Sequence, residues 1–190
     1  MTIHPTRTLL LTACALARGV AACGDDDDSA SAVEPTSTSA PAPAPAADGT
    51  LAVTAVDYAF EGLPDTIEAG TRLTLTNAGT EPHELVAMRI PDDEDRSVEE
   101  LVALPQDELF AVFGGKPEPA TVILAVPGET DQPGAVVGDG TLAEPGRYAI
   151  LCFIPIGSTP DVLDPEADGP PVSDSPPHAA HGMWAEVTVE

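Results

Sequence analysis

The stretch "GRYAILCFI", residues 146–154, has the pattern of a β-strand that faces a protein core. Side chains alternate between the two faces of a strand, so Tyr148, Ile150 and Cys152 share one face. Because tyrosine and isoleucine are expected inside a domain, the pattern predicts that Cys152 points inward at the end of the strand. A free cysteine is commonly a small buried apolar residue, and this stretch alone gives the thiol no other role.

Short apolar or alternating runs, divided by proline, glycine and aspartate, continue on both sides of this stretch. They predict further strands at residues 50–60, 71–77, 83–90, 120–126 and 183–190. Residues 97–104 have helical spacing, with Ser97 as an N-cap and Glu100 three residues later, and predict one short helix. Six or more strands in about 140 residues predict an all-β fold, a Greek-key β-sandwich.

The start of the chain has the layout of a secretory signal. Arg7 precedes a short apolar run, and small residues lead to Cys23. The run is too short to span a membrane. Its end, "VAAC", resembles the lipobox of bacterial lipoproteins, which implies removal of residues 1–22 and lipidation of Cys23. A plain secretory signal cut near Ala22 is the alternative.

Residues 23–49 are rich in Asp, Ser, Thr, Ala and Pro and lack apolar periodicity. Such a segment cannot build a core, so we expect a disordered tether that holds the domain, residues 50–190, clear of a membrane surface. With Cys14 lost in the signal and Cys23 lipidated, Cys152 has no disulfide partner. An exported thiol is open to oxidation unless it is buried or bound, so Cys152 calls for an explanation.

The chain is strongly acidic, with a formal net charge of −25. Residues 1–22 hold two arginines and no acidic residue, so their removal makes the net charge −27. Such a protein repels nucleic acids and anionic lipid surfaces, whereas cationic partners are compatible with it. An acidic surface that serves solubility alone explains the charge equally well.

Histidines and a methionine accompany Cys152 in the sequence. His178, His181 and Met183 precede the last predicted strand, and His83 follows the turn "NAGTEP". A thiolate, imidazoles and a thioether are the ligand set of a trigonal copper site with a weak axial methionine. Such a mixed set, held rigidly, suits outer-sphere electron transfer because the metal changes oxidation state with little rearrangement.

The order of these residues resembles the cupredoxins, the blue copper family that includes plastocyanin. The resemblance covers residues 49–190 and is carried by "LTNAGTEPHEL" (75–85), "PGRYAILCFIP" (145–155) and "HAAHGMWAEVTV" (178–189). It implies a cupredoxin-like sandwich with one type 1 copper. The implied ligands are His83, Cys152, one downstream histidine and Met183.

Two histidines compete for the downstream position. In the family about four residues separate the second histidine from the methionine, which His178 and Met183 match. His181 lies only two residues before Met183, so in an extended chain both side chains would crowd one face. We therefore prefer His178, with His181 as the alternative ligand or as a neighbour that tunes the site.

The chain departs from the family in two places. Relatives keep the cysteine and the second histidine a few residues apart, whereas here a segment rich in proline and acidic residues, 153–177, lies between them. We expect a surface excursion that covers the outer edge of the second histidine or forms a rim for a partner. The second departure is Glu84, which stands where many relatives have an asparagine that braces the two ligand loops. A carboxylate there still leaves the backbone N–H of residue 84 free to bond the sulfur, but the resemblance does not carry the asparagine brace over to this chain.

The sequence favours a membrane-anchored, extracytoplasmic type 1 copper protein that carries single electrons between redox partner proteins with cationic docking surfaces. We expect a monomer. We also expect that the protein is not an enzyme, because one domain has no room for the second copper cluster of a copper oxidase or nitrite reductase. The alternatives are a copper-binding lipoprotein for copper delivery or sequestration, and a metal-free cupredoxin-like binding module.

Overall fold

The structure, a computed structural model, describes residues 49–116, 118–129, 135–163 and 175–190. The predicted signal 1–22, the predicted lipidation site Cys23 and nearly all of the predicted tether 23–49 lie outside these residues, as does the middle of the insertion 153–177. Within the described ranges, no helix is long and apolar enough to cross a membrane.

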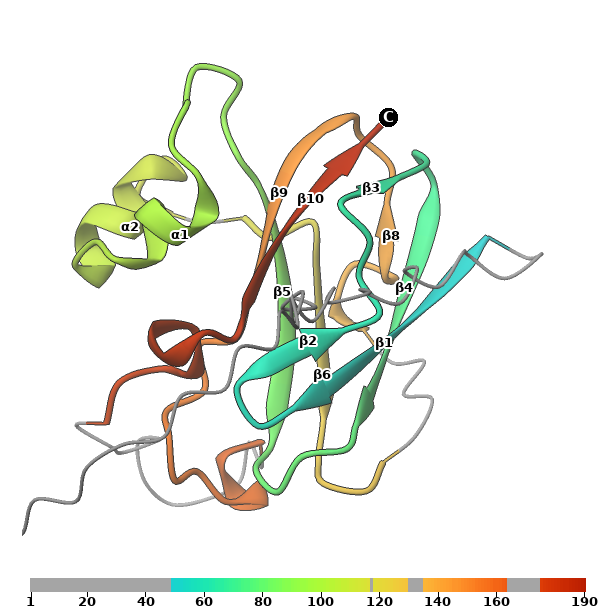
Figure 1. Cartoon of the computed structure of the whole chain (residues 1–190), viewed down its shortest axis with the longest axis vertical. Helices are drawn as coiled ribbons and strands as arrows, with labels where there is room; N and C mark the ends of the chain where they lie inside the picture. Colours follow the sequence, from blue (N-terminus) through green and yellow to red (C-terminus); the bar gives the residue numbers. More distant parts are fainter. Residues whose placement is uncertain (1–48, 117, 130–134, 164–174) are drawn as a thin grey trace, which may run out of the picture. The chain divides into compact units, whose positions relative to one another are not determined.

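Two β-sheets pack face to face, which confirms the predicted all-β sandwich (Figure 1). The first sheet has the order β2 (Ala59–Glu61), β1 (Thr50–Val56), β4 (Thr71–Asn77), β8 (Thr141–Leu142). The second has the order β3 (Thr66–Ile67), β10 (Trp184–Val189), β9 (Gly146–Leu151), β5 (His83–Arg89), β6 (Thr121–Ala125), β7 (Ala135–Val137). The pairs β1–β4 and β3–β10 are parallel and the others are antiparallel, so the chain crosses repeatedly between the sheets, as Greek-key links require.

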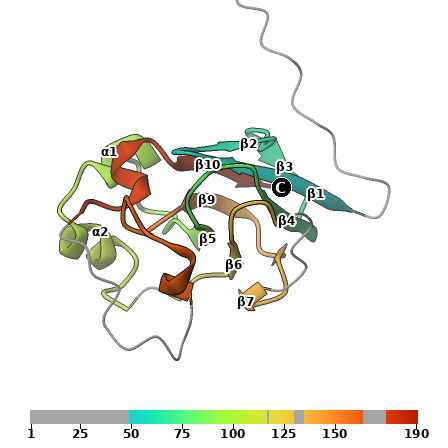
Figure 2. The ribbon, with the colours of Figure 1, turned by 90° about the horizontal axis from the view of Figure 1, so that it is seen from below.

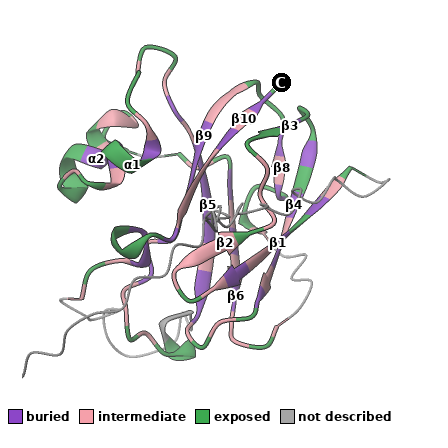
Figure 3. Cartoon of the chain, viewed as in Figure 1, coloured by how far each residue is buried: buried purple, intermediate pink, exposed green. Residues whose placement is uncertain are grey.

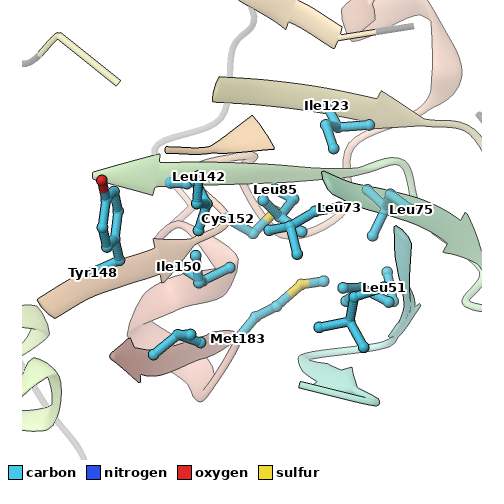
Figure 4. Close-up of a cluster of buried hydrophobic side chains, with 14 of the residues drawn as sticks. Leu51, Leu73, Leu75, Leu85, Ile123, Leu142, Tyr148, Ile150, Cys152 and Met183 are labelled. Carbon is cyan, nitrogen blue, oxygen red and sulfur yellow. The ribbon is translucent and has the colours of Figure 1, made fainter. Parts of the chain in front are cut away.

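The main core fills the space between the sheets (Figures 3 and 4). On β4 every second residue from Thr71 to Asn77 is buried, as the alternation in the sequence predicts. On β9 the predicted face is also confirmed, because Tyr148, Ile150 and Cys152 all belong to this core. The end of β9 therefore points the Cys152 thiol inward.

The outer face of the second sheet is covered by two helices, α1 (Val98–Val102) and α2 (Gln106–Val112), as Figure 2 shows from below. Ala149 and Leu151 of β9 pack in this second apolar cluster. Strands β5 and β9 are thus buried on both faces, and close packing on both sides holds their ends in place.

The helix predicted at 97–104 is confirmed as α1, and the capping box between Ser97 and Glu100 is formed in both directions. The second helix, α2, was not predicted. Leu109 is its one buried residue and Pro105 at its N-cap makes no side-chain hydrogen bond, so both its apolar face and its start signal are weak.

The single strand predicted at 50–60 is wrong in detail, because the chain turns back at Asp57 and Tyr58. Val56 pairs with Ala59, so these two residues form a hairpin loop between β1 and β2. Tyr58 has a φ of 71°, a left-handed conformation that normally favours glycine. A tyrosine at this position gives no turn signal, which is why the sequence reads as one continuous strand.

Candidate metal centre

Three segments converge at one end of the sandwich. His83 begins β5, and Cys152 follows the last residue of β9, which runs antiparallel beside β5. His178 begins a short 3-10 helix, His178–His181, before β10. The backbone N–H of His178 donates to the carbonyl of Ile154 at 2.9 Å. This bond attaches the loop that carries His178 to the loop that carries Cys152, despite the insertion between them.

The ligating atoms of His83, Cys152 and His178 lie within 4.8 Å of one another, and all three residues are 0% exposed. The two Nδ1 atoms face each other at 3.1 Å, and the Sγ of Cys152 lies 3.4 Å from Nδ1 of His178. Two imidazoles and one thiol thus point into a single small volume, and we call His83, Cys152 and His178 the trio. This donor set suits one copper ion.

The outer nitrogens of both rings are already paired with carboxylates. His83 Nε2 lies 3.1 Å from Asp57 and His178 Nε2 lies 3.1 Å from Glu81. When each Nε2–H donates to its carboxylate, both Nδ1 lone pairs point into the centre. The Cys152 thiol can donate to only one of them, and a buried acceptor without a donor is costly. A cation between the three atoms resolves this conflict.

Burial shifts the pKa of Cys152 and of His83. Burial raises the pKa of the Cys152 thiol to about 12, although the Glu84 N–H opposes this shift. Burial likewise lowers the pKa of His83, against the opposing effect of Asp57. A metal ligand must be a neutral imidazole or a thiolate, so the lowered pKa of His83 favours its binding form, and Cys152 would have to lose its proton to bind a metal.

The backbone of Met183 is hydrogen-bonded to two residues of the trio, His178 and Cys152. Its N–H donates to the carbonyl of His178 at 3.1 Å, and its carbonyl accepts the N–H of Cys152 at 3.3 Å. Its side chain is 0% exposed and packs in the same apolar cluster as Cys152 (Figure 4). The sequence groups Met183 with these residues, and the structure brings it to the same end of the sandwich.

His181 lies outside the trio. It ends the 3-10 helix, is exposed, and its ring centroid lies 6.0 Å from that of Tyr58 in a tilted arrangement. Of the two histidines that the sequence leaves as alternatives, His178 is the one that the structure places beside Cys152 and His83.

The missing asparagine brace is replaced by Glu84 itself. Its Oε1 accepts the N–H of Phe153 at 2.9 Å, and its own N–H donates to the Sγ of Cys152 at 3.5 Å. Burial raises the pKa of this carboxyl, while the Phe153 N–H opposes the shift. Glu84 therefore joins the His83 and Cys152 loops. The sequence allowed for its N–H bond to the sulfur, but not for the bond between its carboxylate and Phe153.

Replacing Glu84 tests this brace. Glu84→Ala leaves the Phe153 N–H without its acceptor, and we expect the free energy of unfolding of the metal-free protein to fall by about 1–3 kcal/mol. Glu84→Gln is the matched control, because its amide oxygen still accepts the same bond, and we expect it to lose less stability than alanine. Urea unfolding measures both. Equal losses in the two variants would contradict a role for the hydrogen bond.

The described start of the insertion covers the outer edge of His178. The N–H of Gly157 donates to Glu81 Oε2 at 2.7 Å, and the same oxygen contacts Nε2 of His178. The Tyr58 hydroxyl donates to the other oxygen of Glu81 at 3.1 Å. Sequence reasoning missed Asp57, Tyr58 and Glu81, since isolated acidic residues and a tyrosine in an apparent strand carry no pattern that marks them.

The chain is similar in structure to several solved proteins. Auracyanin B aligns over 74% of this chain and 88% of its own, with 20% identity and a TM-score of 0.41. Auracyanin A, a blue copper protein from Chloroflexus aurantiacus, aligns over 74% of this chain and 98% of its own, with 16% identity and a TM-score of 0.38. The oxidised plastocyanin of Dryopteris crassirhizoma aligns over 73% of this chain and 99% of its own, with 18% identity and a TM-score of 0.32.

No protein-family model and no curated protein matches the chain. Auracyanins and plastocyanin are cupredoxins, the family that the sequence resembles. The fold follows from the strand pairing of this chain, and the chemistry of the site follows from its side chains.

Proposed function

We propose that this protein is an extracytoplasmic type 1 copper protein that carries single electrons between redox partner proteins and is not itself an enzyme. The observation that carries the proposal is the convergence of the His83 and His178 Nδ1 atoms and the Cys152 Sγ at a buried end of the sandwich. Bound copper supplies a reversible one-electron couple between Cu(II) and Cu(I).

In this proposal His83, Cys152 and His178 are the equatorial ligands and Met183 is the axial ligand. The rigidity of the surroundings supports it. Strands β5 and β9 are packed on both faces, and Glu84 and the His178 N–H join the ligand loops. Ligands that cannot move keep the structural change between the two oxidation states small, which favours fast electron transfer.

Burial distinguishes electron transfer from the two alternatives. Copper delivery or sequestration needs ligands that another molecule can reach, whereas all three of these are 0% exposed. A metal-free binding module would keep two facing Nδ1 atoms and a thiol in an apolar interior without a function, at a cost in stability. Neither alternative has an observation in its favour.

Location and partners complete the proposal. Export and a membrane anchor at Cys23 rest on the signal-like residues 1–22. A cationic docking surface on the partner is supported by the net charge of −25 and by the placement of the charges. Asp57 lies at the metal end, while Arg89 and Arg147 lie at the far ends of β5 and β9. We propose a monomer that binds no nucleic acid.

Redox cycling in the presence of a Cu(I) chelator separates the proposed function from copper delivery. The copper-loaded protein is reduced and reoxidised several times with the chelator present, and copper remaining on the protein is measured. Because the ligands are buried, we expect the copper to stay bound and the colour to return after each cycle. Transfer of the copper to the chelator on the first reduction would contradict an electron carrier and support delivery.

A further inference from the structure

A carboxylate covers the outer nitrogen of each histidine in the trio. Asp57 Oδ1 lies 3.1 Å from Nε2 of His83, and Glu81 Oε2 lies 3.1 Å from Nε2 of His178. Because both histidines are 0% exposed, these carboxylates, and not water, are the partners of the two Nε2 atoms. Asp57 and Glu81 come from different loops, so the arrangement depends on the tertiary fold.

Asp57 is held by the loop before β5. Thr80 donates to it twice, from its N–H at 2.9 Å and from its hydroxyl at 2.6 Å. A Cβ on residue 79 would overlap Asp57 Oδ1 and lie 2.7 Å from Nε2 of His83, so Gly79 lets the backbone pass close to this pair. Burial alone would raise the pKa of Asp57, but the hydrogen bonds from Thr80, His83 and Glu81 lower it to about 2.

Glu81 is held from both sides. Tyr58 donates its hydroxyl to Oε1 at 3.1 Å, and Gly157 donates its N–H to Oε2 at 2.7 Å. Burial raises the pKa of Glu81, but the hydrogen bonds from Gly157, His178 and Tyr58 outweigh it, so the pKa is lowered. Partners at both carboxylate oxygens, the Tyr58 hydroxyl, the Gly157 N–H and the His178 ring nitrogen, suit an ionised carboxylate at this position.

The hairpin turn at Asp57 and Tyr58 supports both carboxylates at once. Tyr58 keeps a φ of 71°, which is unfavourable for a bulky residue, and its ring packs edge-on against His178 at 5.1 Å between centroids. Backbone strain persists only where the surroundings hold it, and such positions cluster at functional sites. The turn thus supplies one carboxylate directly and fixes the other through the Tyr58 hydroxyl.

We propose that Asp57 and Glu81 are positioning residues that fix both imidazoles as the Nε2–H tautomer and shift bound copper toward Cu(II). The claim about the copper oxidation state rests on the proposed function. The claim about the histidine tautomers holds with or without copper. A carboxylate that accepts the outer ring proton orients a ligating histidine and raises its basicity. Two fixed negative charges beside the ligands also favour the more highly charged Cu(II) over Cu(I). A lower reduction potential follows.

The tautomers can be measured without copper. The full chain, labelled with ¹⁵N-histidine and purified in detergent, is compared by NMR with Asp57→Asn and Glu81→Gln. We expect His83 and His178 to carry their proton on Nε2 in the parent protein. An amide can donate as well as accept, so each variant should populate the Nδ1–H form of the histidine that it contacts. Asp161→Asn, which removes an exposed carboxylate of the same surface segment as Gly157, should change neither ring.

The redox equilibrium is measured on the copper-loaded forms of the same proteins. We expect Asp57→Asn and Glu81→Gln each to shift the equilibrium toward Cu(I) by about tenfold, which is 59 mV for one electron. Asp161→Asn should shift it by less than about twofold, because salt and water screen an exposed charge.

Each outcome decides the proposal. Nε2–H tautomers together with upward shifts in potential that exceed the Asp161→Asn shift support it. Nδ1–H tautomers in the parent protein, or shifts no larger than that of the control, overturn it. If one variant fails to fold, the other gives the same test on its own histidine. A parent protein that binds no copper would overturn the proposed function, while the NMR measurement would still decide whether Asp57 and Glu81 position the rings.

Discussion

Replacing Cys152 with alanine is expected to abolish the intense blue colour of the copper-loaded protein. The colour of a type 1 site arises from charge transfer between a thiolate and Cu(II), and Cys152 supplies the one free thiol among the described residues. Without it, two imidazoles remain at the centre, and they bind Cu(II) only as a pale complex. The visible spectrum with one equivalent of Cu(II) measures the loss.

Two further variants control the Cys152 experiment. Cys152→Ser should also lose the colour, because a hydroxyl is a harder and far weaker ligand than a thiolate, and it excludes a simple packing defect as the cause. Cys23→Ala should keep the colour, since Cys23 precedes the sandwich domain in the sequence. A Cys152→Ala protein as blue as its parent would contradict the assignment of the thiolate.

The second large effect is expected at His178. Its Nδ1 lies 3.4 Å from Cys152 Sγ and 3.1 Å from Nδ1 of His83, so His178→Ala removes one of three converging donors. We expect loss of the blue species and formation of a pale one. His181→Ala is the matched control, because that ring is exposed and three residues away in the chain, and it should only shift the spectrum. Copper spectra that respond in the reverse order would make His181 the ligand.

The convergence of His83, Cys152 and His178 could be predicted because the signals for it are local and match a family resemblance. Alternation along 146–154 shows which way Cys152 points, and burial of Tyr148 and Ile150 on the same face confirms it. The spacing between His178 and Met183 favours the histidine that the structure places beside Cys152. Thiol, imidazole and thioether side chains that occur together at strand ends carry most of this information.

The residues around the donors could not be predicted because their partners are distant in the chain. Asp57 contacts His83 over 26 positions and Glu81 contacts His178 over 97 positions. The hairpin that carries Asp57 depends on a positive φ at Tyr58, which no residue preference signals. Glu84 replaces the expected asparagine with a different bond, to Phe153, that only the packed loops reveal.

The central claim is that His83, Cys152 and His178 hold one copper ion as a type 1 centre. Titration of the metal-free protein with Cu(II), followed by visible absorption and electron paramagnetic resonance, tests it most directly. The structure predicts an intense blue species that saturates at one copper per chain, disappears on reduction and returns on reoxidation. A pale Cu(II) species, or a colour that does not saturate at one equivalent, would contradict it.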